Sequence, residues 1–376
     1  MFFVSAFAFF AAGYTLVPTL PLILHDRGAT PAQVGLVMGA FTGASLLLRA
    51  PVGRILARES PLPLLRWGQL ALGLGFAAYF VPGGLWSPLA GRVIQGIGFA
   101  AFNTAAYVYL AELAGPSRRA EYMSLLGLSA NVAMGLAPAV GSLLLGRVGE
   151  TGLFTAGAAA CGLSLLCLPR GRVAPAAGGR AAWFDPLAWR PAAAMLGLAL
   201  AYGTVMVFVP LAIRGAGLSG GWLFFTVYAA AIITTRLSTR RALDRGGRRK
   251  WIFGGSATVA VAVGLLALSS TWPLFLAAAV LFGAGVGTSH PTLMAYILEC
   301  VPPERRSAAA AMATSAFDAG LAGGAALAGW LAGSFSYSVS FASAAVLLVV
   351  LFSPLALGPA QAAALAPGTP GTSSLT

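Results

Sequence analysis

The chain has 376 residues, of which 58% are hydrophobic and only 9% are charged, whereas a soluble domain carries about 25% charged residues. This composition excludes an ordinary soluble domain and predicts an all-α membrane protein, because the short alternating segments of a membrane β-barrel are absent. The net charge of +13 does not indicate nucleic-acid binding, because most Lys and Arg residues lie in alternate connections between apolar segments.

Apolar segments long enough to cross a bilayer, about 20 residues each, follow one another along the whole chain. We expect twelve spans, at residues 1–24, 32–56, 64–82, 87–113, 121–146, 150–168, 189–213, 219–239, 251–270, 273–300, 307–333 and 337–358. Met1 leads directly into the first span without the charged start of a signal peptide, so that span is expected to remain as a helix.

The longest polar connection, residues 169–188, is rich in Pro, Gly and Arg. It predicts a cytoplasmic linker between an N-terminal six-helix bundle (1–168) and a C-terminal six-helix bundle (189–358). Residues 359–376 are expected to form a disordered tail. The protein is expected to lie in the inner membrane. The bias of Lys and Arg toward alternate connections predicts that both termini lie in the cytoplasm.

The two halves repeat with an offset of 187 residues. This offset places Arg27 on Arg214, Arg49 on Arg236, Arg58 on Arg245, Asn103 on His290, Glu112 on Glu299, Arg118 on Arg305 and Asn131 on Asp318. Such a parallel repeat predicts two pseudo-symmetric bundles with a binding site between them, near the middle of the membrane.

Three motifs occur in the predicted spans or in the connections between them. They are Asp244-Arg245-Gly-Gly-Arg-Arg-Lys250, with a partial first-half copy at Arg49, Gly53 and Arg58; Arg92-x-x-Gln95-Gly-x-Gly-x-Ala100; and Gly135-x-x-Pro138-x-x-Gly141. They resemble the GxxxDRxGRR, RxxQGxGxA and GxxxGPxxGG motifs of the major facilitator superfamily (MFS). In the first-half copy Ala57 replaces the acid, and the Arg run of the second half can equally be a topology signal.

The last motif is typical of drug and other antiporters, and it also serves as a packing device. Residues 20–35, 221–229 and 316–318 resemble the sugar-efflux-like and drug-efflux-like branch, some members of which export opine metallophores. The resemblance implies a secondary transporter that exports a small molecule by proton antiport; a proton-coupled importer of a small organic solute is the alternative. A channel, a membrane enzyme and an ATP-driven pump lack their motifs here.

Asp318 is the only Asp, Glu, His, Lys or Arg between Ala308 and Phe352. A carboxylate near the bilayer centre costs about 2.5–3.5 kcal/mol on insertion scales, so it serves either proton coupling or a structural hydrogen bond. Arg92 and His290 are expected to assist in proton coupling, with hydrogen-bonding roles as the alternative for both.

Two further groups of residues complete the predicted site. The substrate cavity is expected to include Tyr14, Gln95, Asn103, Asn131, Tyr202 and Tyr228. A cytoplasmic gate is expected from Arg49, Gly53, Arg58, Glu112, Arg118, Arg236, Asp244, Arg245, Glu299 and Arg305, with Glu112–Arg118 and Glu299–Arg305 as ion pairs. The predicted partners are a small-molecule substrate, protons and the lipid bilayer; we expect a monomer without nucleic acid, metal or cofactor.

Overall fold

The computed structural model describes residues 1–169, 185–244, 247–302 and 305–357, without the side chains of 115–117, 119, 120, 124, 131, 240–244 and 307. These residues form helices and no strands. The helices are α1 (Phe2–Asp26), α2 (Pro31–Leu56), α3 (Pro61–Ala78), α4 (Trp86–Leu166), α5 (Trp189–Gly215), α6 (Trp222–Asp244), α7 (Arg248–Ala267), α8 (Trp272–Glu299), α9 (Arg306–Ser334) and α10 (Tyr337–Leu357). The predicted all-α fold is confirmed.

Helix α4 turns back on itself twice, although its helical assignment is continuous. Its contacts in chain order are Ser87 with Ala78, Tyr109 with Phe2, Tyr122 with Phe3, Glu150 with Arg27, Phe154 with Tyr79 and Ser164 with Ser5. These partners alternate between the two ends of α1 and α3, so α4 makes three antiparallel passes. Gly149, whose φ of 70° lies in the left-handed region, occupies the second reversal, where a residue with a Cβ would be strained.

The three spans expected at 87–113, 121–146 and 150–168 correspond to the three passes of α4, but the structure joins them in one continuous helical run. A tight reversal can keep helical hydrogen bonds on both sides of a single turn residue, so a change of direction does not require a break in the helix. Among the described helices, eight stretches are long and apolar enough to cross a membrane, two of them within α4.

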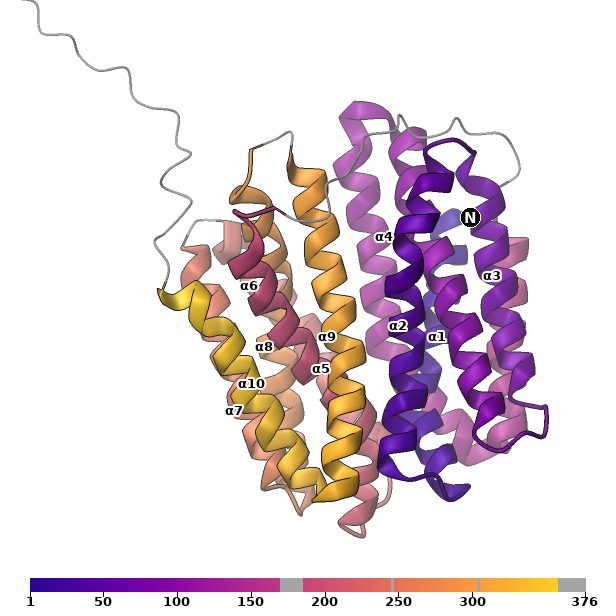
Figure 1. Ribbon diagram of the computed structural model, residues 1–376, viewed down its shortest axis with the longest axis vertical. Coiled ribbons are helices and arrows are strands. Elements are labelled where there is room, and N and C mark those ends of the chain that lie inside the picture. Colours follow the sequence, from indigo (N-terminus) through magenta and orange to yellow (C-terminus); the bar gives the residue numbers. More distant parts are fainter. Residues whose placement is uncertain (170–184, 245–246, 303–304, 358–376) are drawn as a thin grey trace, which may run out of the picture.

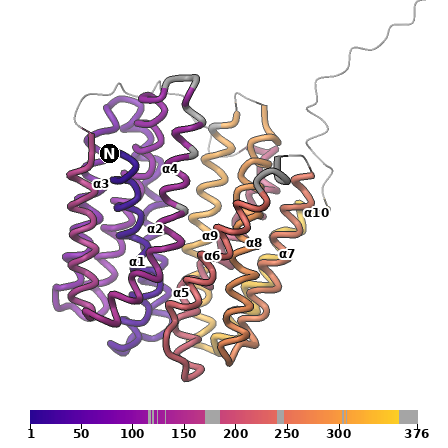
Figure 2. The backbone as a smooth tube through the Cα atoms, turned by 180° about the vertical axis from the view of Figure 1, so that it is seen from behind, coloured from indigo at the N-terminus to yellow at the C-terminus, as the bar shows by residue number. Residues whose placement is uncertain are grey.

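Two bundles lie side by side in Figure 1, with α1–α4 in one and α5–α10 in the other. Figure 2 shows from behind that α4 stays with α1 and α3. Within the bundles α3 and α1 pack on α4, and α5 packs on α9 and α10. The bundles meet where α2 packs on α9, α4 on α6 and α1 on α5.

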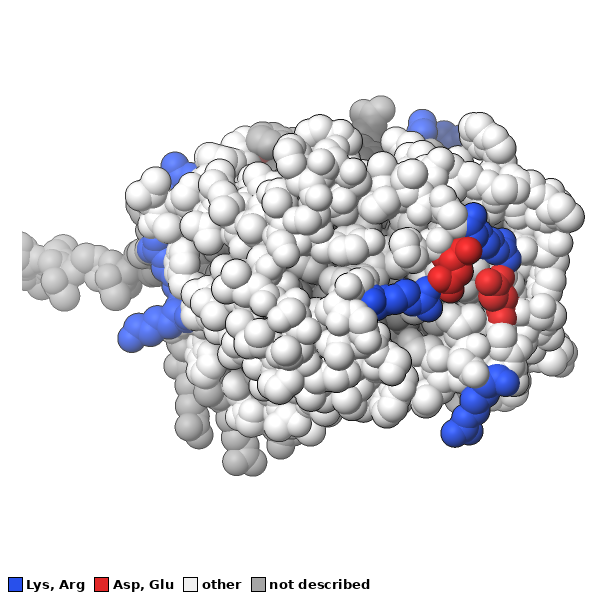
Figure 3. Space-filling model, turned by 90° about the horizontal axis from the view of Figure 1, so that it is seen from below, with Lys and Arg blue, Asp and Glu red and all other residues white. Residues whose placement is uncertain are grey.

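We call the two ends of the molecule the Phe2 end and the Asp26 end, after the first and last residues of α1. At the Asp26 end the bundles are tied together, because Arg214 of α5 forms an ion pair with Asp26 of α1. Arg27 pairs with Glu150 on the same face. Figure 3 looks at this face and shows acidic side chains beside basic ones in one area, with further basic side chains around the edge of a mostly uncharged surface.

Glycines allow the two bundles to approach closely near the Asp26 end. The Cβ that Ala would add at Gly35 of α2 would collide with the carbonyl oxygen of Ala325 and lie 3.0 Å from the Cα of Gly329, both on α9. One turn further, a Cβ at Gly39 would lie 3.1 Å from the carbonyl oxygen of Ala322. Small residues of this kind are how membrane helices reach close packing.

The end of the predicted linker is packed rather than solvated. Asp185 is only 3% exposed, and its Oδ1 accepts a hydrogen bond of 2.8 Å from the backbone N–H of Leu187. A short polar residue can bond its own following backbone in this way, which stabilises a turn before a helix. The rest of the predicted linker, apart from Pro169, and the predicted tail lie outside the described residues.

Candidate functional site

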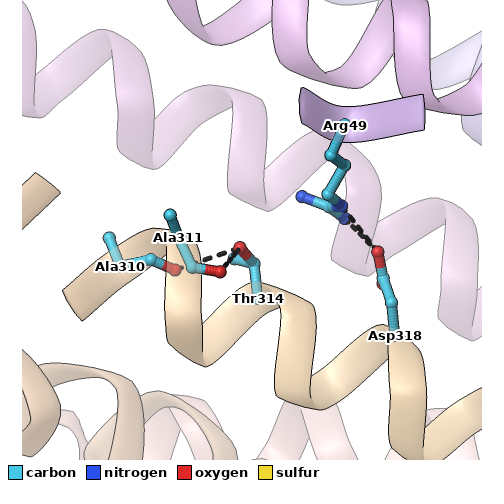
Figure 4. A network of polar contacts seen from close by, with 5 residues as sticks. All are labelled: Arg49, Ala310, Ala311, Thr314 and Asp318. Carbon is cyan, nitrogen blue, oxygen red and sulfur yellow. Dashed lines mark hydrogen bonds and ion pairs between the residues drawn. The ribbon is translucent and has the colours of Figure 1, made fainter. Parts of the chain in front are cut away.

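Among the described residues, one ion pair joins the two bundles in the interior, between Arg49 of α2 and Asp318 of α9. The Arg49 Nε donates to Asp318 Oδ2 at 2.6 Å, and Arg49 Nη2 lies 2.6 Å from the same oxygen. Figure 4 shows the two side chains extended toward one another from facing helices. Asp318 is 5% exposed, so this carboxylate is nearly free of solvent in a pair that crosses the interface.

Each partner lies well inside its helix. Arg49 is seven residues before the end of α2, and Asp318 lies near the middle of α9. One turn before Asp318, the hydroxyl of Thr314 donates to the backbone carbonyls of Ala310 and Ala311 and so does not compete for the carboxylate (Figure 4). The charge of Asp318 is therefore balanced by the opposite bundle, and breaking this pair would release one interior contact between the halves.

A central cavity of about 90 Å³ lies between the bundles. Both halves line it, with Phe10, Gly13, Tyr14, Val17, Met38, Phe41, Thr42, Arg92, Phe99, Met134 and Pro138 from the first and Tyr202, Gly203, Met206, Val207, Leu321 and Ala325 from the second. Of the predicted cavity residues, Tyr14 and Tyr202 lie in this wall. A mostly apolar lining with a few polar groups, between two domains, is typical of a binding site, although ligand pockets usually have about 300–1,000 Å³.

Arg92 lies in the cavity wall and is 3% exposed. Its guanidinium carbon lies 4.4 Å from the centre of the Phe41 ring, and its Nη1 donates to Gln95 Oε1 at 3.3 Å. The same Gln95 oxygen accepts a hydrogen bond of 2.8 Å from the hydroxyl of Tyr79. The Arg92 Nε has no hydrogen-bond partner in the described part of the structure.

The remaining predicted polar residues lie outside this cavity wall. Gln95 is fully buried against α3, where it binds Arg92 and Tyr79. The Tyr228 hydroxyl donates to the Tyr202 hydroxyl at 3.2 Å from a fully buried position. His290 packs edge-on against Phe317, with the ring centres 4.8 Å apart. Asn103 is half-buried on α4, and the side chain of Asn131 lies outside the described part.

The predicted gate pairs were wrong, because nearer partners are available. Arg118 binds Glu121 at 3.0 Å, one turn along the same helical run, instead of Glu112. Glu299 binds Arg248 at 2.8 Å, and Arg305 lies 3.8 Å from Asp185.

The other residues predicted for the gate are spread over several places. Arg49 belongs to the interior ion pair rather than to a surface gate. Gly53, Arg58 and Glu112 are exposed near the Phe2 end, whereas Arg236 is half-buried on α6. Arg245 and the side chain of Asp244 lie outside the described residues.

Two features of the site could not be found from sequence patterns. The Arg49–Asp318 pair joins residues 269 positions apart, and the repeat offset relates Arg49 to Arg236 rather than to its partner. The aromatic wall of Phe10, Phe41 and Phe99 comes from spans in which almost every residue is apolar, so no pattern distinguishes the residues that face the cavity.

Comparison with protein families gives a match to the model of the Major Facilitator Superfamily at residues 2–240 and again at residues 192–371. This chain belongs to the Major Facilitator Superfamily. The predicted family is thereby confirmed, and the chain is a multi-pass membrane transporter of a small-molecule substrate.

Relatives in the superfamily cover most of the chain at low identity. The staphylopine export protein of Staphylococcus aureus (strain Mu50) is 23% identical over 93% of this chain and 93% of its own length. The MFS-type transporter YhhS of Escherichia coli (strain K12) is 26% identical over 88% of this chain and 85% of its own.

Solved structures of the superfamily show the same fold. The nucleoside transporter NupG has a TM-score of 0.76 at 15% identity and covers 94% of this chain and 97% of its own. A bacterial homologue of the lysosomal transporter Spinster, in an inward-facing and occupied conformation, has a TM-score of 0.75 at 14% identity, with 95% of both chains covered.

Proposed function

We propose that this transporter exports a small organic molecule by alternating access and that Asp318 carries the coupling proton in exchange. The observation that supports this most strongly is the buried Arg49–Asp318 pair, which joins the two bundles beside a cavity that both bundles line. A buried ion pair persists only while both members keep their charges. Protonation of Asp318 would therefore remove the attraction and favour separation of α2 from α9.

This pair gives a physical sequence for transport. With Asp318 charged, the pair holds the bundles together between the cavity and the Phe2 end. A proton that enters from the other side neutralises the carboxylate, releases Arg49 and lets the bundles part toward the Phe2 end. Loss of the proton there restores the pair. The equilibrium between the two arrangements then depends on the proton, which is the requirement for coupling.

The direction is supported by two observations. The staphylopine export protein is similar over nearly the whole chain, and the Gly135–Gly141 motif resembles that of antiporters. We further propose that the protein lies in the inner membrane, with the Phe2 end and both termini facing the cytoplasm. The Arg-rich connections support this orientation, since positive residues are retained on the cytoplasmic side.

The first test compares wild type, Asp318→Asn, Asp318→Glu and the exposed control Glu59→Gln in reconstituted vesicles with an imposed pH gradient. We expect Asp318→Asn to lose the part of transport that the gradient drives while it keeps exchange of substrate without a gradient. Glu59→Gln should resemble wild type. Full gradient-driven transport by the Asn variant would remove Asp318 from proton coupling, and uptake in the direction of the proton would identify an importer.

A further inference from the structure

The interior of the transporter holds more positive than negative charge. Three arginines, Arg49, Arg92 and Arg236, are buried or half-buried more than one turn inside a helix pass. Among the residues that the structure describes, Asp318 is the only acidic one at such a depth, since the other described acidic residues lie in a connection or within a few residues of the end of a pass. One carboxylate therefore balances one of three guanidinium groups.

Asp318 is already paired with Arg49, so Arg92 has no acidic partner among the described residues. None of the ion pairs within the described residues includes Arg92 or Arg236. Around Arg92 the contacts are neutral, namely the oxygen of Gln95 and the face of Phe41. A buried charge is normally compensated by a partner because its desolvation is costly. Arg92 has a donor, its Nε, that remains unused among the described residues.

The wall around Arg92 suits an apolar or aromatic body. Phe10, Phe41 and Phe99 lie in one half of the cavity, and Met206 and Leu321 face it from the other half. The cavity volume of about 90 Å³ is smaller than the roughly 150 Å³ of a cavity that holds benzene. An aromatic ligand would consequently require the bundles to move apart, which alternating access provides.

We propose that this cavity selects an organic anion, whose carboxylate or phosphate group binds Arg92 and whose apolar body packs on the surrounding aromatic residues. The planar guanidinium group matches both oxyanions with paired hydrogen bonds. This inference rests on the proposed transport function, because it takes the central cavity as the transport site, but it does not depend on which residue carries the proton.

The anion and the proton would act at different places. Arg92 lies six residues from the start of its pass at the Asp26 end, whereas Arg49 lies seven residues from the Phe2 end of α2. An anion at Arg92 does not compete with a proton for Asp318. The anion and the proton would therefore be exchanged because the cavity opens to one side of the membrane at a time. They would not be exchanged by competing for one binding group.

The test is a binding measurement on the purified full chain in detergent, without any gradient. The probes are 2-naphthoate, 2-naphthyl phosphate and the neutral 2-naphthamide, which share one apolar body, and the readout is the rise in unfolding temperature with concentration. We expect one or both anions to bind at least about tenfold more tightly than the amide, as a charge-assisted hydrogen bond would give. The two anions separate carboxylate from phosphate recognition.

Three variants locate the preference. Arg92→Gln should bind the anions and the amide equally, Arg92→Lys should keep a reduced preference, and the exposed control Arg147→Gln should behave as wild type. Equal binding of the amide, absence of any stabilisation by the anions, or a preference that persists in Arg92→Gln would each overturn the proposal. The wild-type comparison alone already decides whether anions are preferred, so an unstable Arg92 variant does not prevent the test.

Discussion

At the scale of single residues, two of the three guanidinium nitrogens of Arg49, Nε and Nη2, bind the same oxygen of Asp318, Oδ2. The side chain of Arg49 is 19% exposed and that of Asp318 is 7% exposed, so Asp318 in particular has little access to water in place of its partner. Removing one partner of such a buried pair costs about 3–5 kcal/mol, because the remaining charge is left uncompensated, whereas neutralising both is far less costly.

A double-mutant cycle measures this pair directly. We expect Arg49→Gln to lower the unfolding temperature more than the double variant Arg49→Gln with Asp318→Asn. The coupling energy should be on the order of 0.5–3 kcal/mol, the range for residues in contact. Thermal unfolding of the four proteins in one detergent at pH 8 provides the values. Strict additivity of the two single changes would show that the pair contributes nothing to stability.

At the scale of helices, the crossing of α2 and α9 depends on glycine. At Gly35 the backbone of α9 occupies the space that a Cβ would need, whereas at Gly43, two turns further along the same helix, nothing lies within 4 Å. The two positions differ in their neighbours but share a helix, so they form a matched pair for testing whether this contact keeps the Asp26 end closed.

We expect Gly35→Ala to shift the protein toward conformations that are open at the Asp26 end, and Gly43→Ala to leave the distribution unchanged. Overpacking of this kind costs about 1–3 kcal/mol, which is a factor of about 5–150 in the ratio of closed to open states.

Spin labels report this shift. They are placed at His25 and Ser219, which are exposed at the Asp26 end on opposite bundles, in a protein whose three native cysteines are replaced. Longer distances in Gly35→Ala than in Gly43→Ala are the expected result. Identical distributions in the two variants would mean that the α2–α9 contact does not control this end.

The helices themselves could be anticipated from the sequence, because long apolar segments between charged connections leave few alternatives. The start of α5 at Trp189 and the end of α10 at Leu357 lie within one residue of expectation. The gap expected between the spans 121–146 and 150–168 contains Gly149, where the chain reverses, but the continuity of α4 through this reversal could not be anticipated, because a single glycine with positive φ turns the chain without a separate loop. The burial of Asp318 follows from its apolar surroundings, but its partner depends on the crossing of two helices far apart in sequence.

At the scale of the whole molecule, the bundles are related in sequence but differ in charge. Asp318 corresponds to Asn131 by the offset of 187, so only the second half supplies a carboxylate at this depth. The corresponding arginines, Arg49 and Arg236, are both present. The repeat thus keeps the arginine pair Arg49 and Arg236 but supplies the carboxylate at the Asp318 position in only one half, which concentrates any proton coupling in a single position.

The proposed orientation is a further property of the whole molecule. In a cysteine-free background, we expect Ser219→Cys at the Asp26 end to react with a membrane-impermeant maleimide in intact cells. Glu59→Cys at the Phe2 end should react only after lysis, because positive connections are retained in the cytoplasm. Both positions are exposed, so burial does not explain a difference, and the reverse pattern would show the opposite orientation.

The single interior carboxylate also determines how the membrane voltage would act on transport. One titratable acid allows one proton per cycle, and if that proton enters while a monovalent anion leaves, two positive charges move inward. Each charge gains about 2.3 kcal/mol per 100 mV. A cell interior held negative would then contribute about 4.6 kcal/mol per 100 mV to export. In voltage-clamped vesicles, a current of two elementary charges for each substrate molecule transported would reveal this contribution. Under the proposed mechanism, the one acid at Asp318 thus makes export depend on voltage as well as on pH.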